Sequence, residues 1–224
     1  MHRLTYFLTA IIAIFLISCS YQKMPTEITE IPEKTVSSNL KANVPAIFWW
    51  KINQFRLATI LEHYDINHGK WSIQNNALLQ SDSNSPPDHR AIYRYFEEDY
   101  FIFSADLTVT NDDGANYAIG LIFRAKDLMN YYYIYLGQSG EIATAKVING
   151  SWQLLYSRYF EPLPIDKTTR IRIEVQPGKL SVFRDDVLKY TISLEITEFS
   201  TGKVGFTCSW GASAKFENVE IQVF

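Results

Sequence analysis

The sequence is poor in the residues that define several protein classes. Its 224 residues include only 2 Cys, 10 Gly and 8 Pro. Two cysteines exclude a scaffold stapled by disulfides, and the low Gly and Pro content excludes collagen-like and linker-like chains. A formal net charge of −3 leaves no basic excess, so we expect no nucleic-acid partner. No internal repeat, low-complexity tract or helix-length periodic segment occurs in the part that reads as folded.

What the chain does contain is typical of a globular domain. Hydrophobic residues make up 47% and charged residues 20%, and the length allows one ordinary domain with additional targeting segments. The aromatic content is high at 15%, with 14 Tyr and 5 Trp. These aromatic residues are the feature of the composition that calls for an explanation.

The first segment, residues 1–18, reads as a signal peptide. Arg3 is its one firm charge, and the apolar stretch that follows is shorter than the ~20 residues of a membrane-spanning helix. The segment ends in Leu16-Ile17-Ser18-Cys19, which resembles the lipobox of bacterial lipoproteins. That resemblance implies lipid attachment at Cys19, cleavage before it and a membrane anchor in the cell envelope. An ordinary secretory signal, or an uncleaved anchor with a chance cysteine, is the alternative.

The resemblance also bears on sorting and on the second cysteine. By the enteric sorting rule, Ser20 after the lipidated cysteine favours the outer membrane over the inner membrane. If Cys19 carries lipid, Cys208 has no intrachain partner, and its apolar neighbours predict a buried position inside a strand.

The chain divides into a signal peptide, a tether and a domain. Residues 19–45 contain three Pro and scattered charges without a sustained period, which indicates a lipidated tether. Residues 46–224 form the domain, with the first strands from about residue 62. Residues 46–61 fit neither the helix nor the strand period, and their conformation stays open.

From residue 62 onward, short apolar segments alternate with turn signals, a pattern that predicts an all-β, antiparallel β-sandwich. The expected strands lie within 71–80, 91–96, 101–110, 117–125, 131–137, a segment after Gly140, 151–160, 168–175, 179–194, 203–210 and 213–224. In the last of these, Phe216 and Val219 both belong to the core yet have opposite parity. A β-bulge near 217–218 would reconcile them.

The order of these segments resembles the concanavalin A-like lectin/glucanase jelly roll. More narrowly, it resembles the branch of 3-keto-disaccharide hydrolase domains and levan-type carbohydrate-binding modules. The segments that carry it are 69–80, 101–109, 120–136, 150–155, 170–190 and 201–221. Asn75-Asn76 and Asp185-Asp186 replace the family's Asp-Gly turns and keep their turn chemistry, because Asn and Asp tolerate positive φ. Glu217 replaces an Asp, which puts any calcium or network role there in doubt.

Residues for catalysis or metal binding are not arranged as those chemistries need. The retaining glucanases carry E-x-D-x-x-E on one strand, and the nearest match, Glu97-Glu98-Asp99, looks like a turn. His63, His68 and His89 have no zinc spacing, and the run 111–116 lacks a complete calcium loop. We therefore expect no metal and no cofactor, and a non-catalytic protein more than an enzyme.

The candidate ligand residues lie on two neighbouring strands. Alternation places Arg124 at the end of a row with Ala118 and Gly120, on the face opposite the core. Tyr131, Tyr133 and Tyr135 share a face of the next strand, and Trp152 and Arg158 could extend this surface. Aromatic rings pack against sugar rings while hydroxyl and guanidinium groups bind their rims. A sheet face merely coated with Tyr and Arg is the alternative.

These observations favour a lipid-anchored, lectin-like envelope domain that binds carbohydrate without catalysis. Two alternatives remain, which rest on the family resemblance and on the signal peptide. One is a glycoside-processing enzyme of the 3-keto-disaccharide hydrolase type, and the other is a structural envelope lipoprotein that uses the sheet face for protein contacts.

Overall fold

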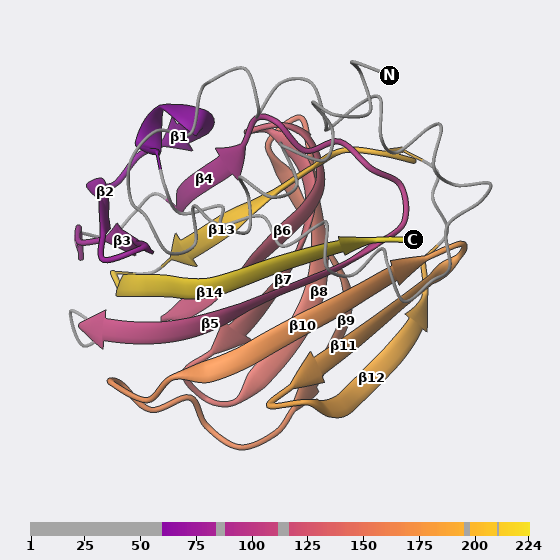
Figure 1. Ribbon diagram of the computed structural model, residues 1–224. Helices are drawn as coiled ribbons and strands as arrows, with labels where there is room; N and C mark the ends of the chain where they lie inside the picture. Colours follow the sequence, from indigo (N-terminus) through magenta and orange to yellow (C-terminus); the bar gives the residue numbers. More distant parts are fainter. Residues whose placement is uncertain (1–59, 84–87, 112–116, 195–197, 210) are drawn as a thin grey trace, which may run out of the picture. The chain divides into compact units, whose positions relative to one another are not determined.

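The computed structural model describes residues 60–83, 88–111, 117–194, 198–209 and 211–224. Apart from one short 3-10 helix, η1 (Leu61–His63), their regular structure consists of strands (Figure 1). Every pairing between these strands is antiparallel. The prediction of an all-β antiparallel sandwich is confirmed, and two sheets of seven strands each form a jelly roll.

The first sheet carries the aromatic segment of the sequence. In sheet order its strands are β1 (Tyr64–Asn67), β4 (His89–Tyr93), β13 (Lys203–Ser209), β6 (Ala118–Asp127), β7 (Asn130–Gly137), β8 (Glu141–Ile148) and β9 (Ser151–Tyr159). Three consecutive antiparallel hairpins join β6 through β9, and β9 is the edge strand of this sheet among the described residues.

The second sheet contains the longest strands. In sheet order they are β12 (Val187–Ser193), β11 (Lys179–Arg184), β10 (Thr169–Gln176), β5 (Phe101–Asn111), β14 (Ser213–Val223), β3 (Ala77–Gln80) and β2 (Trp71–Gln74). Figure 1 shows β14, β5, β10 and β11 of this sheet running in front of β6, β7 and β8 of the first.

The hydrophobic core lies between the two sheets. Phe206 of the first sheet contacts Phe103 and Phe216 of the second, with ring centroids 5.8 Å and 4.8 Å away. On β10, Ile171 and Ile173 are fully buried, as their alternation with charged residues predicts. Burial of these aromatic and aliphatic side chains is the main force that holds the sheets together. Each sheet then keeps one outer face, meaning the face turned away from this core.

The predicted turn chemistry is confirmed at two hairpins. Asn75 and Asn76 have φ of 51° and 62°, and Asp185 and Asp186 have φ of 52° and 61°. Two consecutive residues with positive φ match the right-handed twist of a two-residue hairpin, a conformation that Asn and Asp adopt more readily than other non-glycine residues.

The predicted bulge in β14 is also present. The register between β14 and β5 shifts between Glu217 and Glu220, and Asn218 has φ of 49°. Phe216 and Val219 are consequently both buried in the core. Cys208 is buried within β13, where its Sγ lies 3.0 Å from the carbonyl oxygen of Ala212.

Several expectations concern residues outside the described part of the chain. These are the signal peptide 1–18, Cys19, the tether 19–45, the segment 46–61 up to residue 59, and most of the run 111–116. In the residues that the structure does describe, no helix has the length and hydropathy to cross a bilayer.

Candidate functional site

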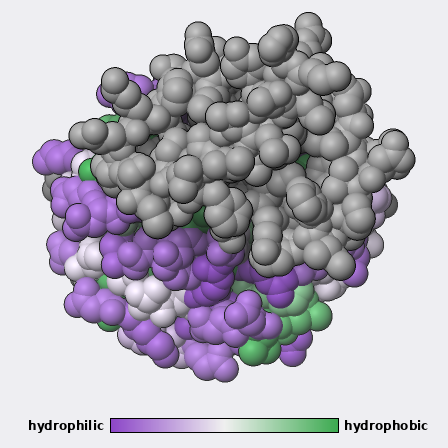
Figure 2. Space-filling view, in the orientation of Figure 1, coloured by the Kyte–Doolittle hydropathy of each residue, from purple (hydrophilic) through white to green (hydrophobic). Residues whose placement is uncertain are grey.

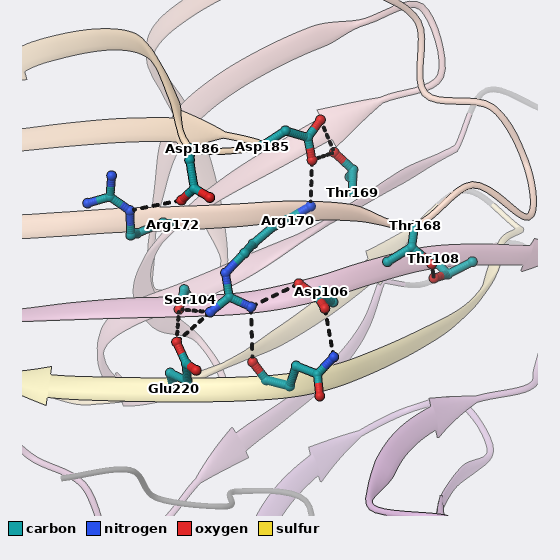
Figure 3. Close-up of polar contacts among 11 residues, drawn as sticks. Ser104, Asp106, Thr108, Thr168, Thr169, Arg170, Arg172, Asp185, Asp186 and Glu220 are labelled. Carbon is teal, nitrogen blue, oxygen red and sulfur yellow. Dashed lines mark hydrogen bonds and ion pairs between the residues drawn. The ribbon is translucent and has the colours of Figure 1, made fainter. Parts of the chain in front are cut away.

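The outer face of the second sheet is a closed network of polar contacts. At its centre Arg170 donates to Asp106 at 2.9 Å, to Ser104 at 2.8 Å and to Glu220 at 2.5 Å (Figure 3). A flanking pair joins Arg172 with Asp186, and the buried Thr169, on the core side of β10, donates to Asp185. These charges and donors have partners within the protein, so this face is organised as an internally paired polar network.

The outer face of the first sheet has a different chemistry, because a row of tyrosines follows β7. The ring centroid of Tyr133 lies 5.6 Å from that of Tyr131 and 5.7 Å from that of Tyr135. We call these three residues the tyrosine row. Their register partners on β8 are Val147, Ala145 and Ala143. The two alanines have small side chains, so on β8 the neighbours of Tyr133 and Tyr135 are much smaller than the tyrosine rings.

Gly120 on β6 leaves no side chain next to the tyrosine row. Its register partner on β7 is Tyr135, and a Cβ at position 120 would lie only 1.9 Å from the carbonyl oxygen of Ile134. Only glycine permits this approach of the two backbones.

Trp152 of β9 joins the tyrosine row from the neighbouring edge. Its indole Nε1 donates a hydrogen bond of 2.8 Å to the hydroxyl of Tyr133. The Trp152 side chain is nevertheless 55% exposed, and Tyr159 further along β9 is 65% exposed. The face therefore presents two accessible aromatic rings, one of which is oriented by a hydrogen bond to the row.

The members of the tyrosine row differ in exposure. Tyr133 is partly exposed, whereas Tyr131 and Tyr135 are buried. Burial raises the pKa of Tyr131 to about 12 and raises the pKa of Tyr133 further. The phenols consequently keep their protons at physiological pH and remain hydrogen-bond donors. Trp152, Tyr133 and Tyr159 are the aromatic residues of this face that solvent reaches, and Tyr131 and Tyr135 lie buried next to Tyr133.

The expectation that Arg124 ends an exposed row is wrong. The register of β6 shifts after Phe123, and Arg124 has φ of 49°, so simple alternation fails there. The Arg124 side chain is fully buried, and its Nη2 donates to the carbonyl oxygen of Asp99 at 2.8 Å. Burial lowers the pKa of Arg124, an effect that the nearby Tyr100, Tyr132 and Asp99 oppose. Arg124 is part of the protein interior.

The expected place of Arg158 beside Trp152 is wrong as well. The register between β8 and β9 shifts at Ala145, leaving Leu155 as an extra residue. After the bulge, Arg158 pairs with the core residue Ile142, and its guanidinium lies 5.7 Å from the ring of Phe160. The same bulge turns Tyr159 to the outer face, opposite Glu141.

Sequence reasoning missed three residues of this face. Tyr159 was hidden by the bulge. The guanidinium carbon of Arg90 lies 5.4 Å from the centroid of the Tyr131 ring. Burial raises the pKa of the Asp88 carboxyl, and the charge of Asp88 in turn raises the pKa of Tyr131 and Tyr133. The alternation of Arg90 with the core residue Ala91 was the available signal for its position.

The residues considered for catalysis and metal binding do not form a site in the described part of the chain. Glu97, Glu98 and Asp99 lie between β4 and β5, where Glu98 forms an isolated bridge with Gly202. His89 is buried and accepts a hydrogen bond from Gln80 through Nδ1. Among the described residues, no three His, Cys, Asp or Glu side chains are grouped closely enough to hold a metal ion.

Comparison with solved structures agrees with the jelly-roll assignment. Carbohydrate-binding module CBM66 from Bacillus subtilis has a TM-score of 0.63 and 22% identity, covering 71% of this chain and 95% of its own. A galectin-like protein of unknown function from Bacillus subtilis has a TM-score of 0.59 and 12% identity, covering 75% and 93%. The β-glucanase of Bacillus licheniformis has a TM-score of 0.55 and 11% identity, covering 77% and 98%. No protein-family model and no curated protein sequence matches this chain. At these identities the likeness establishes the fold, which is the concanavalin A-like, galectin-like jelly roll.

Proposed function

We propose that the domain binds carbohydrate, without catalysis, on the outer face of its first sheet. The observation that carries this proposal is the exposed ring of Trp152, held by its hydrogen bond to Tyr133. An aromatic ring whose orientation is set in advance stacks on the C–H face of a sugar with little loss of entropy. Tyr159, Asp88 and Arg90 add a second ring, an acceptor and donors for sugar hydroxyls.

The fold likeness supports the same function. One similar structure is named as a carbohydrate-binding module and another as a β-glucanase. The β-glucanase likeness alone does not favour an enzyme, since the acids at 97–99 lie outside any strand of this chain. Binding without chemistry is thus the function that the residues of this chain favour.

A screen of glycans against the detergent-solubilised full chain tests the proposal. We expect at least one saccharide to raise the melting temperature, and Trp152→Ala to abolish that rise. Leu188→Ala is the matched control, because Leu188 is a similarly exposed apolar residue on β12 of the other sheet. The proposal fails if no saccharide shifts the melting temperature, or if Trp152→Ala responds as the unchanged protein does.

The cellular location of the protein is the second part of this proposal. We infer from Leu16-Ile17-Ser18-Cys19 that Cys19 carries a lipid that anchors the domain to the bacterial cell envelope, and from Ser20 that the outer membrane is favoured. Cys19→Ala should move the protein from the membrane fraction to the soluble fraction. Retention of that variant in the membrane fraction would contradict the lipid anchor.

The free edge of the second sheet favours one alternative function. Val187 and Leu188 of β12 are 57% and 52% exposed, and Figure 2 shows an apolar patch in the region of this strand. Exposed apolar residues on an edge strand suit contact with another protein. A Leu188→Glu variant that loses a cross-linked envelope partner while still binding saccharide would show that both functions exist side by side.

A further inference from the structure

A hollow of about 250 Å³ opens beside the tyrosine row, at the end of the sheet where β6 turns into β7. Its lining includes Asp65, Arg94, Lys126, Asp127, Leu128 and Lys203. Leu128 also packs against the apolar cluster that contains Tyr131. The hollow and the tyrosine row are therefore neighbouring parts of one outer face.

The two carboxylates of the hollow are already occupied by donors of the protein. Asp65 accepts from Arg94 at 2.7 Å and lies 3.4 Å from Nζ of Lys203. Asp127 accepts from the backbone nitrogen of Met129 and from the amide of Asn130, which closes the β6–β7 turn.

The cations of the hollow keep unused capacity. Arg94, Lys126 and Lys203 have side chains that are 46%, 40% and 26% exposed. Arg94 also donates to the carbonyl oxygen of Glu62, and Lys126 contacts Glu97 and Thr201 outside the lining. The five donors of the guanidinium and the three of each ammonium still outnumber these partners. The lining itself thus has donors in excess and one more cation than carboxylates, and a group that brings acceptors and negative charge would complement it.

Arg90 links the hollow to the tyrosine row. Its Nη1 donates to the carbonyl oxygen of Leu128, and its guanidinium lies beside the Tyr131 ring. Its Nε is buried and has no hydrogen-bond partner among the residues that the structure describes. A buried donor without an acceptor is unfavourable, so the hydrogen-bonding capacity of Arg90 is not filled by the described residues next to the hollow.

The register of the sheet relates the hollow to Trp152. Tyr131 of β7 pairs with Val147 of β8, which pairs with Trp152 of β9. With strands spaced ~4.8 Å apart, Trp152 lies about 10 Å from Tyr131 across the sheet. A chain of a few sugar units would therefore reach from the Trp152 ring to the hollow.

We propose that the ligand of this face is an acidic saccharide, whose sugar rings contact Trp152 and Tyr133 and whose negatively charged group enters the hollow. This inference rests on the proposed carbohydrate-binding function and specifies its ligand class. The shared chemistry is an oxyanion on a sugar, supplied by a uronic carboxylate or by a sulfate ester.

Matched pairs of saccharides test this inference on the detergent-solubilised full chain. The probes are oligogalacturonate with its neutral methyl ester, and dextran sulfate with dextran, each titrated by calorimetry. We expect the charged member of at least one pair to bind about tenfold more tightly than its neutral partner, with the difference shrinking at high salt. The pair that responds identifies the carboxylate or the sulfate as the source of the charge.

Two variants locate the effect. Lys203→Gln should reduce affinity for the charged probe several-fold and leave affinity for the neutral probe unchanged. Lys215→Gln is the control, since Lys215 has a similarly exposed ammonium in an ion pair on the outer face of the other sheet. Equal affinity for charged and neutral members, or no effect of Lys203→Gln, overturns the inference. Binding of neutral glycans alone overturns it but leaves the proposed function standing, whereas binding of no glycan overturns both.

Discussion

The indole nitrogen of Trp152 on β9 donates a 2.8 Å hydrogen bond to the hydroxyl oxygen of Tyr133 on β7, so the bond crosses the intervening strand β8 of the first sheet. This bond holds an exposed ring against a row of tyrosines on the sheet face turned away from the core. It connects the most accessible tryptophan of the described domain to a scaffold that burial makes rigid.

Removing either partner of this bond should weaken saccharide binding. Trp152→Phe keeps a ring but loses the donor, and Tyr133→Phe keeps its ring but loses the acceptor. We expect each variant to lower affinity about threefold to tenfold. The double variant should bind no more weakly than the single variant that has the lower affinity. Calorimetric titration of the four proteins with the same saccharide measures this coupling. Fully additive losses would show that the hydrogen bond does not orient the ring for binding.

Arg124 should matter for stability and not for binding. Arg124→Ala removes a buried side chain and its bond to the carbonyl oxygen of Asp99, so we expect a loss of about 2 kcal/mol in the free energy of unfolding. Urea denaturation measures this loss. At a temperature where the variant is folded, its affinity for saccharide should equal that of the unchanged protein. A loss of affinity in the folded variant would show that Arg124 belongs to the binding site.

The stability of the domain should fall as the pH drops below about 6.5. Burial lowers the pKa of His89 from 6.5, although Asp82 and Asp88 oppose the shift. Below pH 6.5 the unfolded chain then binds a proton that the folded chain does not. This stability is therefore fully present above pH 6.5 and is lost progressively as the pH falls below 6.5 toward the lowered pKa of the folded protein. Linkage limits the slope to about 1.4 kcal/mol per pH unit for one group.

His89→Gln should flatten this dependence when urea denaturation is repeated between pH 7.5 and 5.5. The pKa of His63 is also lowered by burial, so part of the slope should persist in the variant. An unchanged slope in His89→Gln would mean that His89 is not the group responsible.

Two glycines of the first sheet should respond very differently to alanine. A Cβ at Gly120 would overlap the carbonyl oxygen of Ile134, whereas a Cβ at Gly137 would have its nearest neighbour 3.7 Å away. We expect Gly120→Ala to lower the melting temperature strongly or prevent folding, because two paired backbones must separate. Gly137→Ala should change it little. Similar melting temperatures for the two variants would contradict the close approach of β6 and β7.

The fold could be predicted because its signals are local. Two Asn or two Asp at a hairpin, as at Asn75 and Asn76, indicate positive φ by themselves. The bulge of β14 was visible because Phe216 and Val219 are both apolar and must share the core, which alternation alone cannot achieve.

The placement of site residues could be predicted only where the ladder is regular. The tyrosine row lies on unbroken β7 and has the expected face. Arg124 and Arg158 follow bulges that no apolar residue reveals, so counting alternate residues assigns them to the wrong face. The hollow joins β1, β4, β13 and the β6–β7 turn, and this juxtaposition depends on sheet order, which local sequence patterns do not contain.

Hydroxyl-radical footprinting of the full chain, with and without a saturating saccharide, tests the central claim most directly. We predict that the bound saccharide lowers oxidation of Trp152 and Tyr159 several-fold, because both exposed rings lie on the proposed face. Val187 and Leu188 of β12 should be oxidised equally in both states. Unchanged oxidation of Trp152, or protection confined to β12 and the second sheet, would contradict a carbohydrate site on the outer face of the first sheet.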